Sequence, residues 1–397
     1  MQIVNIDNFP QAVEIFKKIG VDPYGIAAMA PKAGHFNILL IKKPCKVANI
    51  IKQEMLSLGG DAAVARGSVA CSVAVTDVLI MGTIKQLAAL AGKLEKQPFG
   101  LDLISHNIRQ ILDNMKIKEY LWQTARREIT LGQRTLIMGI LNVTPDSFSD
   151  GGNYDTWQKA VERGLTMEAQ GADIIDIGGE STRPGAKSVT TKEELLRVIP
   201  VIEKLAAKIK IPLSIDTAKS AVAHAAIAAG AEIINDITAL GGDKKMAKTA
   251  WQTKAALILM HMRGRPRTMQ QGDLHYDDLL YEIMSYLQKS ADKAMDIGIE
   301  KNRLVIDPGI GFGKTAEDNY KILKNLSQLK ALGMPVLIGT SRKSFIGKIT
   351  ADEPQKRIEG TAASVAAAIM NGCHIVRVHD VGQMKKVAQV TDAIRHA

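Results

Sequence analysis

The pattern of apolar and polar positions repeats along the chain from Leu136 onward. Each repeat has a short apolar run, a polar loop and a longer segment with the spacing of an amphipathic helix. The apolar runs are residues 136–141, 173–177, 211–215, 232–235, 256–260, 303–306, 335–338 and 374–378. Strands that alternate with helices indicate a parallel sheet, and eight such units in about 260 residues predict a closed (β/α)8 TIM barrel. An open, doubly wound parallel sheet is the alternative that this pattern leaves.

The front of the chain lacks this regular repeat. Apolar runs predict strands at 36–41 and 78–81, and helical spacing predicts helices at 46–58, 84–95 and 104–115. Segments 127–131 and 134–137, separated by Gly132 and Gln133, predict a hairpin that leads into the barrel. We therefore expect the α/β class, with a small N-terminal α+β domain of unknown role over 1–124 and a TIM barrel over 125–397.

Composition narrows the classes of partner. The chain has 397 residues, of which 46% are hydrophobic, so it can bury a large core. Its net charge of +10 first suggests nucleic acid. About half of that excess lies on each side of residue 130 without a long basic run, and aromatic residues make up only 4%. We therefore expect a small anionic substrate and no nucleic-acid partner.

The cysteines and the apolar segments indicate the compartment. Cys45, Cys71 and Cys373 are far apart and show no metal-binding spacing, so we expect buried, reduced thiols. The first residues do not have the pattern of a signal peptide. The apolar stretch 69–81 is short and contains Asp77, so we expect no membrane span. Together these features predict a cytoplasmic protein.

Polar residues follow almost every predicted strand. In chain order they are Asn142, Asp176, Asp216, Asn235 with Asp236, His261, Asp307, Thr340 leading to Lys343, and Arg377 with His379. An aspartate after a strand is commonly only a helix N-cap, and a single histidine there is commonly structural. Because barrel enzymes carry their chemistry at the carboxyl ends of the strands, the full set predicts one polar concave site.

Three loops and one pair of basic residues add to this picture. Residues 307–314 (DPGIGFGK) follow the sixth predicted strand, and their glycines would let backbone approach a flat ligand, although an ordinary βα turn also explains them. The loops 142–152 and 178–185 are rich in Ser, Gly, Asp and Pro, which favours covering loops. Arg377 and His379 have the i, i+2 spacing that places two side chains on one face of a strand.

These motifs resemble the dihydropteroate synthases, the pterin-binding TIM-barrel family. The matching segments are 139–152 (GILNVTPDSFSDGG), 171–186 (GADIIDIGGESTRPGA), 214–217 (SIDT), 234–237 (INDI), 260–264 (MHMRG), 307–313 (DPGIGFG), 341–347 (SRKSFIG) and 377–380 (RVHD). The resemblance covers about residues 120–397, and the motifs occur in the family's order.

The resemblance implies a role for each matching position. The residues it implies for the pterin are Asp216, Asn235, Met260, Asp307, Phe312 and Lys343. Those for the diphosphate are Asn142, Arg377 and His379, with Mg²⁺ bound at Asn142. Those for p-aminobenzoate are Phe148, Asp150, Thr182, Arg183, Pro184 and Ser344. Lys343, Asp216, Arg377 and His379 are the expected catalytic residues.

The implied reaction joins 6-hydroxymethyl-7,8-dihydropterin diphosphate to p-aminobenzoate, giving 7,8-dihydropteroate and diphosphate for folate biosynthesis. The resemblance also implies a sulfonamide target and a homodimer formed through barrel helices. The extra residues before about 120 depart from the family, and we expect them to be non-catalytic. Two alternatives stay open: a pterin-binding methyltransferase with a corrinoid partner, and a paralogue without turnover. The motifs TPDSFSD and SRKSF and the intact Asp216, Asp307, Lys343 and Arg377 argue against both.

Overall fold

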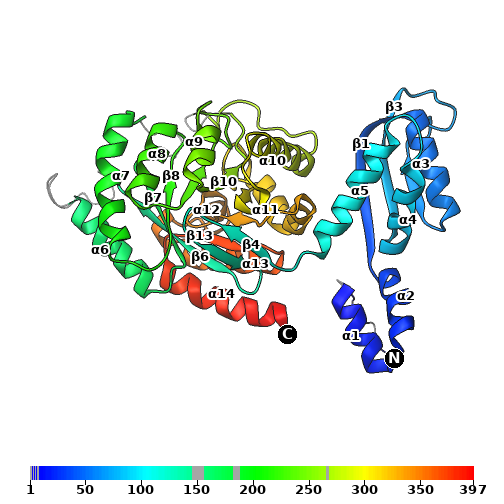
Figure 1. The fold of residues 1–397 in the computed structure, drawn as a ribbon, viewed down its shortest axis with the longest axis horizontal. Helices are drawn as coiled ribbons and strands as arrows, with labels where there is room; N and C mark the ends of the chain where they lie inside the picture. Colours follow the sequence, from blue (N-terminus) through cyan, green and yellow to red (C-terminus); the bar gives the residue numbers. More distant parts are fainter. Residues whose placement is uncertain are drawn as a thin grey trace. The chain divides into compact units, whose positions relative to one another are not determined.

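The structure, a computed structural model, describes residues 2, 4, 6, 9–144, 156–181, 188–264 and 268–397. The chain divides into two compact units, Met1–Ile117 and Lys118–Ala397 (Figure 1). The division falls before the predicted boundary at 124. The reason is that the segment after Ile117 forms a hairpin that packs on the barrel.

The second unit is a TIM barrel, as predicted. Its eight strands are hydrogen-bonded in the order β11-β10-β9-β8-β7-β6-β13-β12, and all their pairings are parallel. A parallel bridge between Ile306 and Val336 joins the first and last strands of this order. That bridge closes the sheet and excludes the open doubly wound alternative. The strands are β6 Leu136–Asn142, β7 Ile174–Gly178, β8 Leu213–Asp216, β9 Ile233–Asp236, β10 Ala256–Met260, β11 Leu304–Asp307, β12 Leu337–Ile338 and β13 Ile375–Val378.

Helices connect these strands and surround the barrel (Figure 1). They are α6 Thr156–Ala169, α7 Thr191–Ala206, α8 Ser220–Ala229, α9 Met246–Thr253, α10 Leu279–Asp296, α11 Ala316–Lys324, α12 Ser344–Thr350, α13 Ile358–Met370 and α14 Val381–His396. Short 3-10 segments lie at Lys301–Arg303, Leu326–Leu332 and Pro354–Lys356. Side-chain caps mark the start of several of the α-helices. Before α7, for example, Thr190 and Glu193 form a capping box.

Strand alternation separates the barrel's two faces. On β8, Leu213 and Ile215 belong to the core shared with the helices, so Ser214 and Asp216 point into the barrel. By the same rule the buried Met138 and Ile140 of β6 line the interior. The interior is thus apolar along most of its length and becomes polar at the carboxyl ends of the strands.

A hairpin covers the opposite, amino-terminal end of the barrel. β4 Tyr120–Gln123 pairs with β5 Glu128–Leu131 in antiparallel register. The predicted hairpin between 127–131 and 134–137 is therefore wrong. The first segment pairs with residues 120–123, which precede it in the chain, and the second segment leads into barrel strand β6. Trp122, only 1% exposed, donates its indole N–H to the carbonyl of Arg303 at 3.2 Å. This burial against the barrel explains the pairing.

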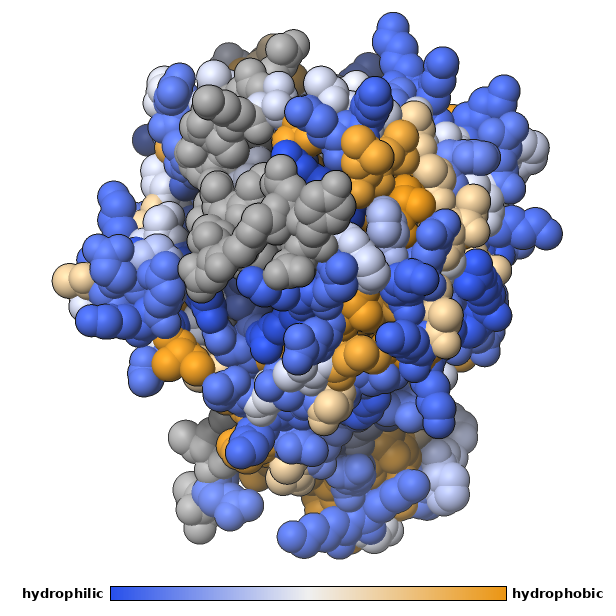
Figure 2. All heavy atoms as spheres, turned by 90° about the vertical axis from the view of Figure 1, so that its left-hand side faces the viewer, coloured by the Kyte–Doolittle hydropathy of each residue, from blue (hydrophilic) through white to orange (hydrophobic). Residues whose placement is uncertain are grey.

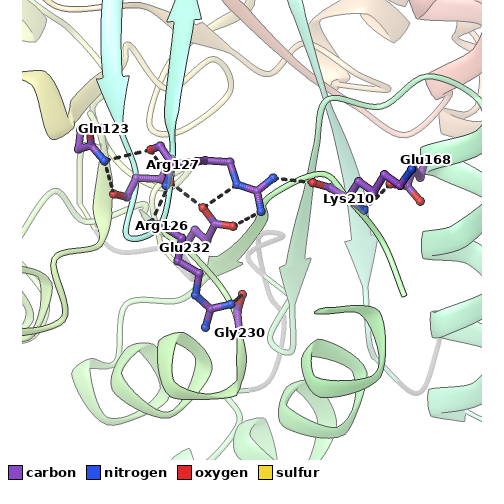
Figure 3. A network of polar contacts seen from close by, with 8 residues as sticks. Gln123, Arg126, Arg127, Glu168, Lys210, Gly230 and Glu232 are labelled. Atoms are coloured by element: carbon purple, nitrogen blue, oxygen red, sulfur yellow. Dashed lines mark hydrogen bonds and ion pairs between the residues drawn. The ribbon is translucent and has the colours of Figure 1, made fainter. Parts of the chain in front are cut away.

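Glu232 fixes this hairpin to the barrel (Figure 3). The buried carboxylate accepts hydrogen bonds from Thr124 Oγ1 at 2.6 Å and Arg127 Nε at 3.1 Å. Arg127 also donates to the carbonyl of Lys210 at 2.5 Å, and Arg126 donates to the carbonyl of Gly230 at 3.4 Å. Since these partners precede β8 and β9, the network lies at the end of the barrel away from the polar interior residues.

The first unit is a small α+β domain, as predicted. Its antiparallel sheet has the order β1-β3-β2, and its core includes Ile51, Ile80 and Leu90. Two helices at the front, residues 9–19 and 23–33, and the short strand at 61–64 were not predicted. Its elements are α1 Phe9–Ile19, α2 Pro23–Ala33, β1 His35–Pro44, α3 Cys45–Ser57, β2 Asp61–Val64, β3 Val75–Thr83, α4 Ile84–Leu94 and α5 Leu101–Lys116.

Two of the three cysteines differ from the prediction. Cys45 and Cys71 form a disulfide, with their Cα atoms 5.7 Å apart. The turn before β3 returns the chain to the start of α3, and their separation of 26 residues in sequence gave no sign of this. Cys373 is a free, buried thiol, as expected.

The visible surface is mainly hydrophilic, with apolar residues in separate small groups (Figure 2). On the barrel, for example, Trp157, Leu196 and Trp251 are exposed on three different helices. Scattered apolar residues of this kind are ordinary on a folded protein. Among the described residues, no helix has the length and apolar character needed to cross a membrane.

Candidate active site at the barrel mouth

Arg377 is the centre of the polar interior. Its Nε donates to Asp176 Oδ2 at 2.6 Å, and its Nη2 donates to Asp216 Oδ2 at 2.7 Å. Asn235 Nδ2 donates to the same oxygen of Asp176 at 2.9 Å. Four strands therefore place their last inward-facing side chains in one hydrogen-bonded group. Burial raises the pKa of Asp216 to about 7 in spite of the opposing charge of Arg377.

Lys343 and Asp307 lie next to this group. Burial and the nearby charge of Arg377 lower the pKa of Lys343 to about 8, although Asp307 and Asp216 oppose the shift. Burial raises the pKa of Asp307 to about 6, while the backbone N–H of Gly309, 2.7 Å from Asp307 Oδ1, acts to lower it. Two acids and two cations thus share one partly desolvated space, in which their charges interact strongly.

An apolar wall borders the charged group. It consists of a small cluster of buried residues that is separate from the main core: Ile237, Met260, Met262, Met269 and Phe312. Lys343 Nζ lies 4.2 Å from the centroid of the Phe312 ring. Met260 and Phe312, both predicted for the pterin, therefore lie together beside the charged residues. A flat heterocycle suits such a site, because its faces contact apolar side chains and its edges meet polar ones.

His379 lies at the end of β13 and is held by its neighbours. Its Nδ1 lies 3.0 Å from Ser341 Oγ, and its backbone N–H donates to the same hydroxyl at 3.2 Å. Two bonds from Arg342 to Asp380, at 3.1 and 2.6 Å, also join the two loops. This link brings the SRKS segment, including the exposed Ser344 at the start of α12, to the end of β13.

Asn142, predicted to bind the metal, also lies at this mouth. A methyl group added to Gly178 would lie 3.7 Å from Asn142 Oδ1 and 3.8 Å from Asp216 Oδ2. Two oxygen atoms thus border the same space, and oxygen ligands are what Mg²⁺ prefers.

The structure therefore brings most of the predicted site residues to one end of the barrel. These are Asn142, Asp216, Asn235, Met260, Asp307, Phe312, Lys343, Ser344, Arg377 and His379. The remaining ones, Phe148, Asp150, Thr182, Arg183 and Pro184, lie outside the described residues. Asp176 was noted at a strand end but given no role. The sequence feature that could have indicated a role is a single carboxylate within an apolar run, between Ile175 and Ile177.

Comparisons with known proteins identify relatives of this barrel. The sequence profile of the family described as pterin binding enzyme matches residues 138–379. The dihydropteroate synthase of Synechocystis is 48% identical over 264 residues, which are 66% of this chain and 91% of that protein. A probable bifunctional folylpolyglutamate synthase/dihydropteroate synthase of Halobacterium salinarum is 38% identical and aligns with 98% of this chain and 47% of its own length. A solved Xanthomonas albilineans dihydropteroate synthase with 4-aminobenzoic acid has 44% identity and a TM-score of 0.65, covering 70% of this chain and 99% of that one.

Proposed function

The chain belongs to the pterin-binding enzyme family, and we propose that the residues around Arg377 are where it performs the dihydropteroate synthase reaction. It condenses 6-hydroxymethyl-7,8-dihydropterin diphosphate with p-aminobenzoate to give 7,8-dihydropteroate and diphosphate, a step of folate biosynthesis. The observation that carries the proposed site is the meeting of Asp216, Asp307, Lys343 and Arg377 at one end of the barrel.

The pterin occupies the space between the apolar wall and the charged group. One edge of the ring carries adjacent N–H donors, which a single carboxylate can accept together. Asp307 fits this contact because it is buried and ends its strand beside the wall. Lys343 donates to acceptors on the ring, and Asn235 contributes a further polar contact. Met260 and Phe312 contact the faces of the ring.

The diphosphate lies on the side of Arg377 and His379. A guanidinium group offers several donors in a fixed geometry that matches phosphate oxygens. Mg²⁺ fits beside Asn142, where one amide oxygen and the substrate's phosphate oxygens would hold it. When bound, the ion stabilises the negative charge on the leaving group. p-Aminobenzoate contacts Ser344 and the predicted loop residues Thr182, Arg183, Pro184, Phe148 and Asp150.

The chain needs no covalent nucleophile for this reaction. The C–O bond between the pterin methylene carbon and the diphosphate breaks, and the ring delocalises the positive charge that forms on that carbon. Arg377 and His379 stabilise the departing diphosphate by hydrogen bonds. The amine nitrogen of p-aminobenzoate then forms the new C–N bond and releases a proton to water or to the departing diphosphate. Lys343, Asp216 and Asp307 orient the ring so that the methylene carbon faces the amine.

The direct test is release of diphosphate from the full chain. We expect release that depends on both substrates and yields 7,8-dihydropteroate, identified by mass spectrometry. Lys343→Ala should abolish turnover and keep the fold, measured by circular dichroism, because it removes the cation that faces the ring. Lys321→Ala is the matched control, since Lys321 is an exposed lysine on α11. Normal rates in Lys343→Ala would show that the site is assigned wrongly.

Three broader features are also proposals. The N-terminal unit has a counterpart in the Halobacterium relative, and we propose a non-catalytic role for it. A homodimer through barrel helices is supported by exposed apolar residues on α13 and α14, Met370, Val390 and Ile394, and light scattering would test it. We also propose a cytoplasmic location, in which the Cys45–Cys71 disulfide would be an exception to the reduced thiols usual there.

A further inference from the structure

Lys314 is a buried lysine directly after the glycine loop that follows Asp307. It is only 2% exposed. Its Nζ donates to the carbonyl oxygens of Gly309 at 3.0 Å and Phe312 at 3.1 Å, and it lies 2.9 Å from Nδ1 of His261. The ammonium group has three donors, and besides these three partners its Nζ also lies 3.5 Å from the carbonyl oxygen of His261, so every donor has a partner. The first two partners lie in the loop, and the third lies at the end of β10.

The chemistry of His261 fits this arrangement. Burial and the adjacent Lys314 lower the pKa of His261 far below its usual range, so the ring is neutral. A neutral ring next to an ammonium group presents Nδ1 as an acceptor and carries its proton on Nε2. Burial also lowers the pKa of Lys314, to about 7. A buried lysine is costly, so we expect its bonds to serve the neighbouring site.

The loop needs such an anchor because of its shape. Gly309, Gly311 and Gly313 all have positive φ, at 69°, 80° and 64°, so the backbone turns repeatedly and directs carbonyl groups inward. A side chain on Gly309 would overlap the carbonyl oxygen of His261. The loop therefore packs backbone to backbone against the segment after β10, and Lys314 joins the two from within.

Both ends of this loop belong to the pterin site. Gly309 donates its N–H to Asp307 Oδ1 at 2.7 Å, so the carbonyl and the N–H of one glycine connect Lys314 to the carboxylate. Phe312, whose carbonyl Lys314 also binds, forms part of the apolar wall and faces Lys343. A displacement of the loop would move both residues at once, whereas Arg377 and His379 belong to another strand.

We propose that Lys314 is a positioning residue for pterin binding: it holds the 309–313 loop against His261 and so fixes Asp307 and Phe312 where the ring is recognised. This role rests on the proposed pterin site. Lys314 acts through the loop and forms no bond to the substrate.

The test compares Lys314→Met, which keeps the length of the side chain and removes its donors, with Lys321→Met on the exposed side of α11. Lys314→Gln is a second variant that keeps N–H donors without the charge. We expect Lys314→Met to raise the KM for the pterin diphosphate at least tenfold and to lower kcat less than threefold. Lys314→Gln should fall between this variant and the parent, and Lys321→Met should match the parent. Thermal melting reports any loss of folding separately.

Several outcomes would overturn the inference. An unchanged KM in both Lys314 variants, or a fall in kcat with KM unchanged, would remove the positioning role. A drop in melting temperature with normal kinetics would show that Lys314 only stabilises the fold. A failure of the proposed function would look different: the parent protein itself would release no diphosphate in the same assay.

Discussion

Replacing Asp176 by asparagine tests whether the buried carboxylates orient Arg377 for catalysis. Asp176 is fully buried and accepts hydrogen bonds from both Arg377 and Asn235. Asparagine has nearly the same volume, but it is neutral, so the one oxygen that accepts from both Arg377 and Asn235 loses the negative charge that strengthens these bonds. The guanidinium group would then have an ionic partner only in Asp216, at 2.7 Å, and would be held less firmly in its orientation.

The expected loss follows from the type of bond that is removed. A misplaced Arg377 would lose a hydrogen bond to the leaving diphosphate, and loss of one such preorganised donor costs about 3 kcal/mol of transition-state stabilisation. A loss of about 3 kcal/mol in transition-state binding lowers kcat/KM roughly 100-fold. The assay is diphosphate release at varied pterin diphosphate, with the fraction of folded protein checked by thermal melting.

Asp236→Asn is the matched control. Asp236 is equally buried at the end of strand β9, but it accepts its bonds from Thr238 and from the backbone N–H of Leu240. It should lose stability and keep kcat/KM within about threefold, a change below 1 kcal/mol. If Asp176→Asn also keeps kcat/KM within threefold, the orientation of Arg377 does not depend on Asp176 and the reasoning is refuted.

Three further predictions concern stability. Burial raises the pKa of Asp307 to about 6 from an ordinary value of 3.8, so the folded state loses stability as the pH rises between these values. Asp307→Asn should therefore match the parent at pH 4 and be more stable at pH 8 by up to about 3 kcal/mol in urea denaturation; equal stability at both pH values would contradict this. Glu232→Ala should destabilise the barrel by about 1.5–3 kcal/mol, because it removes the charged acceptor of Thr124 and Arg127. A urea midpoint like that of the parent would contradict this. Cys71→Ser should lower the free energy of unfolding of the N-terminal unit by about 3 kcal/mol, because the disulfide joins cysteines 26 residues apart and so restricts the unfolded chain. The variant should keep the parent's kcat, and a melting profile equal to that of the parent would contradict the prediction.

The sequence predicted the barrel well because its signals are local. Each apolar run and the helix after it form a unit whose spacing is visible in the chain, and all eight strands lie within a few residues of their predicted positions. The carboxyl ends of parallel strands meet by geometry, so residues as distant as Asp216 and Arg377 could be assigned to one site. The hairpin failed because either neighbour of 128–131 offers a plausible partner strand, and only burial of Trp122 decides between them.

The partners of buried polar groups could not be predicted in the same way. Lys314 seemed to be the end of a turn, and Asp176 an ordinary strand end, because their bonds join segments that are far apart in sequence. The Cys45–Cys71 disulfide has the same character. Periodicity reports which face of an element is buried, but it does not report which polar atoms meet there.

The two ends of the barrel divide stability from chemistry. At the mouth, burial moves the pKa values of Asp216, Asp307 and Lys343 toward 7. The charged forms of these groups therefore lower the stability of the fold, and the same burial strengthens their interactions with a ligand. At the other end the Glu232 carboxylate is fully bonded to Thr124 and Arg127 and supports the fold. Between the two ends, the described interior side chains of β6, Met138 and Ile140, are buried and apolar. For this reason substitutions at Glu232 and at Asp307 should act independently, and a double variant should show the sum of the two changes in unfolding free energy.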